Sequence, residues 1–118
     1  MLVEQSPECC RELYLMTEAD SRAALVQADF LEVDIERIGG AVDAVIMNAP
    51  FKMGRDIKHT MHASGFVKPG GILVGLCYDG VKQNKKLKPE CDSWEVLPAD
   101  SFKAEGTKAS VAMLSIEL

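Results

Sequence analysis

The chain carries few positive charges. Thirteen lysine and arginine residues stand against eighteen acids in 118 residues, and the net charge is −5. Proteins that bind nucleic acid with their whole surface are more often basic, because phosphate groups attract lysine and arginine. This balance argues against a general nucleic-acid binder. Any contact with a polyanion must come from a local patch.

Metal-type spacing of cysteine and histidine is also missing. The four cysteines lie at positions 9, 10, 77 and 91, and no two of them have the spacing Cys-x-x-Cys. Two of them are sequence neighbours and Cys77 lies in an apolar run, which favours reduced thiols in a cytosolic chain. His59 and His62 are three residues apart on an expected helix, with no cysteine or carboxylate at a matching position. We therefore expect no metal site there, and a solvated helix face instead.

The sequence has no signal-peptide pattern, no long apolar span, no internal repeat and no low-complexity tract. These absences predict neither membrane insertion nor export, and they favour a cytoplasmic protein. Hydrophobic residues make up 47% of the chain, which argues against wholesale disorder. At this length we expect a single domain over residues 1–118, able to bury about two thirds of its unfolded surface.

What the sequence does contain is an alternation of strand-like and helix-like segments. Apolar runs predict strands at residues 2–4, 23–28, 42–47, 72–78, 94–97 and 110–117. Short turns or helices separate them, and the last two strands suggest a hairpin-like pair. The order predicts an α/β doubly wound fold with a mostly parallel sheet and a C-terminal antiparallel pair.

Two helices can be placed from their periodicity. Ser6 and Pro7 have the residue types of a helix cap and a first helical position, and the buried side is expected to carry Cys9, Leu13 and Met16. A second helix is expected from about Asp56 to Phe66, with residues 57, 61 and 65 on one face and an end at residues 68–71. One helical turn is expected at residues 35–38, before Gly39 and Gly40. Residues 79–89 are expected to form a polar loop.

Three apolar runs finish in a side-chain oxygen. The first ends at Glu4, the second at Asp29 with Phe30 after it, and the third at Asn48, followed by Ala49, Pro50 and Phe51. Because the carboxyl ends of parallel strands meet at one edge of a sheet, we expect these oxygens to line one ligand site.

Five short motifs, in this order, carry a resemblance to a known family: Leu-Val-Glu-x-Ser-Pro-Glu, Gln-Ala-Asp-Phe, Val-Ile-Met-Asn-Ala-Pro-Phe, Lys-Pro-Gly-Gly and Leu-Pro-Ala-x-x-Phe-Lys-x-x-Gly-Thr. Together they resemble the class I S-adenosylmethionine-dependent methyltransferases, over nearly the whole chain. The chain is most similar to the amino-group enzymes with an Asn-Pro-Pro-Tyr/Phe signature, which include adenine-N6 DNA methylases. The resemblance implies a Rossmann-like sheet and S-adenosyl-L-methionine as cofactor.

The chain departs from that family in two ways. It begins at what would be the second strand, so the family's first strand and its Gly-x-Gly cofactor loop are absent, and Ala49 replaces the first signature proline. In the family sheet the absent strand lies between the strands that correspond here to residues 2–4 and 42–47. We therefore expect a partial domain, truncated at the N-terminus and stabilised by self-association, for instance as a dimer. A separate N-terminal piece that docks, and a rearranged sheet, are alternatives.

By the resemblance, three residues near the strand ends contact the cofactor. Glu4 would accept the ribose hydroxyls, Asp29 would accept the adenine amino group, and Phe30 would stack near the ring. Each of these residues could instead have a purely structural role. Glu4 would then be a solvated strand end, Asp29 a cap of a turn or short helix, and Phe30 a core residue.

The resemblance implies that the catalytic segment consists of Asn48, Ala49, Pro50 and Phe51. It also implies that Asn48 contacts the cofactor. The Asn48 oxygen and the Ala49 carbonyl would accept the two hydrogens of an exocyclic amine and favour its pyramidal transition state. Phe51 would stack on the target base, which in duplex DNA must be flipped out. In the alternative interpretation Asn48 bonds local backbone at a strand–turn junction. Ala49 frees one backbone torsion where the signature has proline.

The functional prediction is methyl transfer to an exocyclic amino group, most specifically adenine N6 in nucleic acid. The alternative is a non-catalytic remnant of the fold that acts as a binding or assembly module. A different Rossmann-like nucleotide binder is disfavoured because no phosphate-cradling loop is present. Lysines 82, 85, 86 and 88 form the basic cluster, which either touches phosphates or is a hydrated loop, and residues 101–107 resemble a turn near the family's substrate cleft.

Overall fold

The computed structural model describes residues 1–98 and 110–118. The chain divides into two compact units, unit 1 from Met1 to Gly40 and unit 2 from Ala41 to Leu118. Strands and helices alternate along the chain as the sequence predicts. Within the described part of the chain, no helix combines the length and the apolar composition needed to cross a membrane.

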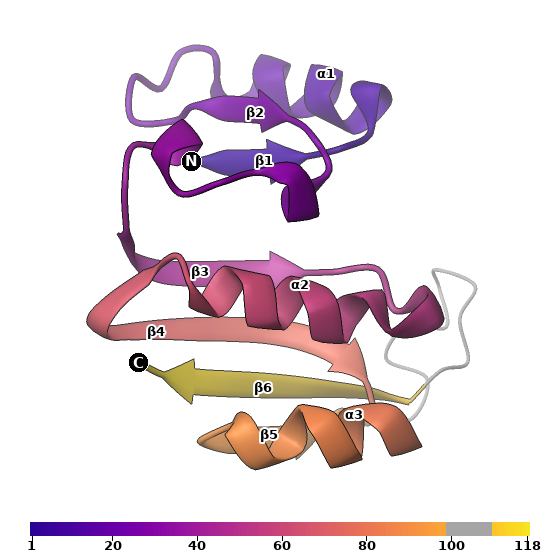
Figure 1. Ribbon diagram of the computed structural model, residues 1–118. Coiled ribbons are helices and arrows are strands. Elements are labelled where there is room, and N and C mark those ends of the chain that lie inside the picture. The colour runs from indigo at the N-terminus through magenta and orange to yellow at the C-terminus, as the bar shows by residue number, and fades with distance from the viewer. Residues whose placement is uncertain (99–109) are drawn as a thin grey trace. The chain divides into compact units, whose positions relative to one another are not determined.

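Unit 1 pairs two short parallel strands. Strand β1 (Leu2–Glu4) lies beside β2 (Leu25–Gln27), in a register that puts Val3 opposite Val26. Helix α1 (Pro7–Thr17) connects them (Figure 1). Two 3-10 turns follow, η1 (Phe30–Glu32) and η2 (Glu36–Ile38). The expected turn before Gly39 is confirmed, because Gly39 ends η2 at a positive φ of 91°, a conformation that glycine adopts without strain.

The start of α1 is as predicted, but its buried side is not. The backbone N–H of Cys9 donates to the Ser6 hydroxyl over 3.3 Å, with proline in the first turn. Cys10 is the buried residue of this helix, whereas Cys9 is exposed and Met16 is 80% exposed. The Cys10 thiol donates to the Glu4 carbonyl over 3.3 Å. Cys10, and not Cys9, therefore faces the end of β1, which the periodicity alone did not reveal.

The described part of unit 2 is built on a four-stranded sheet in the order β3-β4-β6-β5 (Figure 1). Strand β3 (Val42–Asn48) runs parallel to β4 (Val67–Tyr78), while β6 (Val111–Glu117) is antiparallel to β4 and to β5 (Ser93–Val96). This confirms the predicted combination of parallel strands with a C-terminal antiparallel pair. Among the residues that the structure describes, β3 has one strand neighbour, as β1 does in unit 1. The filling of these edges by self-association stays a prediction.

Helix α2 (Arg55–Ser64) packs against β4 (Figure 1). Its buried residues are Asp56, His59, Thr60 and Ala63. On the sheet the buried apolar side chains include Leu73, Cys77 and Leu114. The prediction of a solvated face for His59 is wrong, since His59 is 7% exposed, whereas Met61 is 52% exposed. The α2 face that meets the sheet is the one with polar side chains, which hydrophobic spacing could not identify.

Two predicted boundaries also change. Residues 68–71 do not separate the helix from the strand, because β4 already begins at Val67. The backbone there is paired: the N–H of Gly70 donates to the Leu118 carbonyl over 2.7 Å, and the N–H of Leu118 donates to the Gly71 carbonyl over 3.0 Å. Residues 79–89 are not all loop, since they contain α3 (Val81–Lys86) and the 3-10 turn η4 (Lys88–Glu90).

Gly71 provides a test of the β3–β4 packing. A Cβ at this position would lie 2.5 Å from the backbone carbonyl oxygen of Asp43 and 2.5 Å from Val67 Cγ1. We expect Gly71→Ala to separate the two strands and to lower the free energy of unfolding by about 1–3 kcal/mol in urea denaturation. Gly65→Ala is the matched control, because its Cβ would have an ordinary 3.4 Å contact at φ −70°. Equal stability of the two variants would contradict the close approach.

Candidate functional site

Strand β3 delivers Asn48 to the carboxyl edge of the unit 2 sheet. Asn48 is the last residue of the strand and lies opposite Leu76 of β4. Its side chain is exposed and makes no hydrogen bond with any residue that the structure describes. The alternative that Asn48 bonds local backbone therefore has no support among these contacts. The amide is available to a ligand.

The residues after Asn48 turn sharply into α2. Ala49 is 6% exposed and Phe51 is half-buried. The 3-10 turn η3 (Lys52–Gly54) follows, with positive φ angles of 59° at Met53 and 71° at Gly54. A left-handed conformation costs a non-glycine residue about 1–2 kcal/mol, so the surrounding structure must hold Met53 there. The N–H of Arg55 donates to the Lys52 carbonyl and ties the turn to α2.

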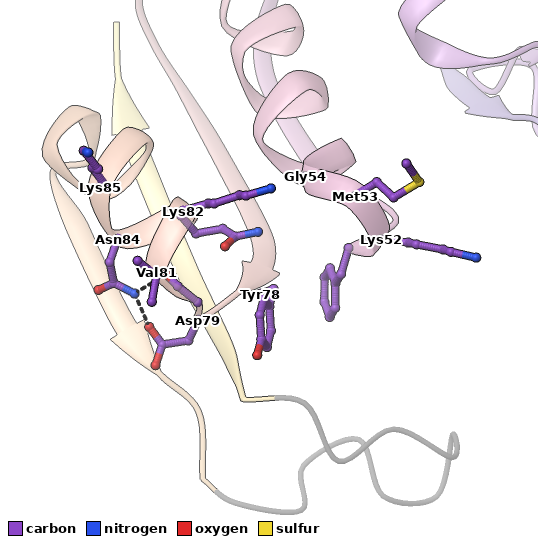
Figure 2. A pocket seen from close by; sticks show the side chains of 12 residues that line it. Lys52, Met53, Gly54, Tyr78, Asp79, Val81, Lys82, Asn84 and Lys85 are labelled. Carbon is purple, nitrogen blue, oxygen red and sulfur yellow. Dashed lines mark hydrogen bonds between the residues drawn. The ribbon is translucent and has the colours of Figure 1, made fainter.

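A hollow of about 1210 Å³ opens beside this turn. One wall is the segment from Phe51 to Gly54, and the other is formed by the end of β4 and by α3, from Tyr78 to Lys85. Figure 2 shows the side chain of Tyr78 at the end of β4, on the side of the second wall that faces the first. Parallel pairing of β3 with β4 brings these two strand ends together. We call this hollow, lined by residues 51–54 and 78–85, the cleft.

The cleft has a mixed electrostatic character. Lys52 belongs to one wall, and Lys82 and Lys85 belong to the other. Asp79 is engaged, since it accepts a 2.8 Å hydrogen bond from the Asn84 side chain (Figure 2). The predicted cluster of four lysines therefore divides: the Lys88 ammonium lies 5.9 Å from the centre of the Trp94 ring instead. Lys52, Lys82 and Lys85 are the lysines that line the cleft.

Behind the cleft lies a buried polar group, Asp56 of α2, which is 0% exposed. Its carboxylate accepts hydrogen bonds from the backbone N–H of Tyr78 and from the side chain of Gln83. Burial, with smaller contributions from Asp56 and other nearby groups, raises the pKa of the Cys77 thiol to about 12. Cys77 is therefore an inert thiol at neutral pH.

Unit 1 places two of the predicted cofactor residues at one edge of its own sheet. Glu4 ends β1 opposite Gln27, and Asp29 follows β2 by two residues. One oxygen of Glu4 accepts the N–H groups of Gln5 and Ser6, both over 3.0 Å, and among described residues the other oxygen accepts none. A half-engaged carboxylate of this kind fits a ribose hydroxyl. The glycine-rich turn of the family has no counterpart in the sequence.

Asp29 and Phe30 start the η1 turn. The Asp29 carboxylate accepts the N–H of Leu31 over 3.1 Å and so caps the turn, as the alternative interpretation expected. Phe30 is half-buried. Convergence of Glu4, Asp29 and Asn48 on one site involves both units and stays a prediction. Among the described residues, no group of three or more potential metal ligands occurs, and residues 101–107 lie outside them.

Sequence reasoning missed Tyr78, Asp56 and Gln83 as parts of this site. Tyr78 stands two residues beyond the position paired with Asn48, so the parallel pairing itself would have pointed to it. Asp56 and Gln83 gave no such signal. An acid in the first turn of a helix and a glutamine in a lysine-rich segment both look solvated until the structure shows that they are 0% and 4% exposed.

The fold has counterparts among solved structures. The chain is 13% identical to an rRNA methylase from Streptococcus thermophilus (TM-score 0.58), 17% to TrmN from Thermus thermophilus (TM-score 0.63) and 21% to the M. jannaschii tRNA m1G37 methyltransferase (TM-score 0.63). Each similarity covers 98% of this chain, and 72%, 35% and 36% of the three proteins respectively. No family model and no curated protein matches the sequence. At these identities the comparisons show the fold: the chain has the Rossmann-like α/β fold of class I methyltransferases.

Gly80 provides a test of the cleft wall. It has extended backbone angles, φ −118° and ψ 175°, but a Cβ there would lie 2.5 Å from Tyr78 Cε1 and 2.9 Å from Gln83 Oε1. We expect Gly80→Ala to displace the Tyr78 ring and to shift its aromatic proton resonances. Val81→Ala shortens an 86% exposed side chain of the same wall and should leave these resonances in place. Unchanged Tyr78 resonances in Gly80→Ala would refute the described wall.

Proposed function

We propose that this chain is an S-adenosylmethionine-dependent methyltransferase, or a part of one, that methylates an exocyclic amino group of a base in RNA. The observation that carries the proposal is the unengaged Asn48 amide at the end of β3, with Phe51 three residues away in the wall of the cleft. The resemblance of this segment to the family signature agrees with the fold.

The cofactor supplies a methyl group on a sulfonium centre. The chain's own residues prepare the acceptor. An exocyclic amine is a weak nucleophile because its lone pair is delocalised into the ring. Hydrogen bonds from the amine to the Asn48 oxygen and the Ala49 carbonyl favour the pyramidal nitrogen of the transition state over the planar ground state. Phe51 stacks on the ring and restricts its orientation, which contributes through proximity.

RNA is the proposed acceptor class for two reasons. The three compared structures are named as an rRNA methylase, TrmN and a tRNA methyltransferase, and none of these names refers to DNA. The cleft also carries Lys52, Lys82 and Lys85 in a chain whose net charge is −5. These lysines can meet a few phosphates locally, and single-stranded RNA presents unstacked bases without the cost of opening a duplex. Within RNA, adenine N6 is the specific acceptor we propose.

In the proposed cofactor site, Glu4 binds the ribose hydroxyls and Asp29 and Phe30 contact the adenine. The open oxygen of Glu4 supports this assignment. The alternative function is a non-catalytic module that binds or assembles with a partner, a role that needs no Gly-x-Gly turn in the chain. A second copy of the chain, or a further segment beside β1 and β3, would complete the site under the main proposal.

Substitution of Asn48 tests the chemistry. We expect Asn48→Ala to lower the methyl-transfer rate about 100-fold, because it removes one of two acceptors for the amine. Asn48→Asp retains an acceptor oxygen of nearly the same size and should lose less. The measurement is transfer of radioactive methyl from labelled S-adenosylmethionine to single-stranded RNA, with matched DNA alongside. Since Asn48 is exposed, both variants should melt like the wild type. An unchanged rate in Asn48→Ala would exclude the proposed role.

Cofactor binding separates the two candidate functions. We expect S-adenosylhomocysteine to bind more tightly than about 0.1 mM, which corresponds to about 5.5 kcal/mol. Glu4→Gln should weaken binding about tenfold or more by removing a charged hydrogen-bond acceptor. Titration calorimetry gives both values, and light scattering of the same sample gives the mass of the assembly. No heat and no change of melting temperature at millimolar ligand would favour the binding module.

A further inference from the structure

The Asp56 carboxylate joins three segments of unit 2. It accepts the N–H of Ile57 over 2.9 Å in its own helix and the N–H of Tyr78 over 2.8 Å at the end of β4. The Gln83 side-chain nitrogen of α3 lies 3.1 Å from each of its oxygens. A carboxylate that is 0% exposed is costly unless such donors surround it. The arrangement is therefore a specific one.

The hydrogen bond to Tyr78 lies just beyond the end of the β3–β4 ladder. Strand β3 ends at Asn48, opposite Leu76, whereas β4 continues two residues further. The N–H of Tyr78 therefore lies beyond the last strand pair with β3, and the Asp56 side chain supplies the acceptor. On the side where β3 has ended, a side chain takes the place of a strand as partner of the β4 backbone, while on the other side Tyr78 still pairs with Val111 of β6.

The same carboxylate also bears on the opposite wall. Asp56 is the second residue of α2, directly after the turn that carries Phe51 and Lys52. That turn is tied to the helix by the hydrogen bond from the Arg55 N–H to the Lys52 carbonyl. Gln83, 4% exposed, anchors α3, which forms the rest of the second wall. The second wall is therefore bound to the Asp56 carboxylate directly, and the first wall is connected to Asp56 through the start of α2.

We propose that Asp56 is the positioning residue of the cleft, and that with Gln83 it sets the separation of Phe51 and Tyr78 so that a flat nucleobase enters between the walls. The inference rests on the proposed function and concerns the acceptor base, not the cofactor. Asp56 acts through Tyr78, Gln83 and the η3 turn. It is not a catalytic residue.

Three isosteric variants test this role. Asp56→Asn leaves one oxygen where two backbone N–H groups and the Gln83 amide need acceptors. Gln83→Glu places two carboxylates together, which disfavours both in their ionised form. The double variant D56N/Q83E restores an amide–carboxylate pair in the opposite order. The matched control is Asp92→Asn, because Asp92 accepts the N–H of Glu117 over 2.6 Å, and Glu117 pairs with Ile72, six positions before Tyr78 along β4.

Two measurements on the full chain decide the outcome. One is the hydrogen-exchange rate of the Tyr78 amide by NMR, and the other is the affinity for adenosine monophosphate by chemical-shift titration. We expect each single variant to accelerate exchange and to weaken binding about tenfold. The double variant should regain part of the losses, because the carboxylate introduced at position 83 accepts from the amide introduced at position 56, while that amide still offers only one oxygen to the N–H groups of Ile57 and Tyr78. Asp92→Asn should stay within about twofold of the wild type.

The proposal is overturned if Asp56→Asn binds the nucleotide like the wild type, if the double variant is as impaired as the two singles combined, or if Asp92→Asn loses as much. Melting curves show whether a variant is folded. If Asp56→Asn is unfolded, the comparison of Gln83→Glu with the double variant tests the positioning role. Neither measurement involves methyl transfer. A failure of the proposed chemistry is therefore distinguishable from a failure of this positioning role.

Discussion

The parallel pairing of β3 with β4 is the interaction on which the candidate site depends. In a parallel pair both strands end at the same edge, so Asn48 and Leu76 lie opposite each other and the two following loops face one another. The loop after β3 brings Phe51 to this edge and the last residue of β4 is Tyr78, although 26 residues lie between the two in the sequence. A one-residue slip in the register would turn Asn48 to the other face of the sheet. The close approach of Gly71 to the Asp43 backbone opposes such a slip.

Strand pairing brings the two loops together but does not by itself fix the distance between them. Loops usually vary more in position than the strands they follow. Here a buried carboxylate joins the helix after one loop to the end of the other strand, and Gln83 adds α3 to the same centre. Polar networks of this kind specify one arrangement when every member is satisfied. The left-handed Met53 is the sort of local strain that such an arrangement can hold in place.

Much of the fold could be predicted because strands and caps have local signals. Val42–Asn48 is mostly apolar, with β-branched residues at 42, 45 and 46, and Ser6 with Pro7 has the chemistry of a helix start, so both were placed within a residue. The buried faces of α1 and α2 were predicted wrongly for a different reason. Cys10 is buried where its thiol contacts the Glu4 carbonyl, Asp56 is buried where it accepts the N–H of Tyr78, and His59 is buried on the helix that packs against β4. Tertiary contacts decided these positions, and hydrophobic spacing does not record them.

The residues of the site that lie at strand ends could be predicted from the sequence. Glu4 and Asn48 were identified because each terminates an apolar run, while Tyr78 was counted as the last residue of a strand and α3 as loop. The replacement of a signature proline by Ala49 looks like a loss of rigidity at the reacting edge. A freed torsion costs about 0.4–1 kcal/mol, mainly through the unfolded chain. Ala49 is 6% exposed, so packing restricts the backbone that the proline ring would otherwise restrict. The loss of the proline ring is therefore offset in part by packing around the residue whose carbonyl the proposed chemistry uses.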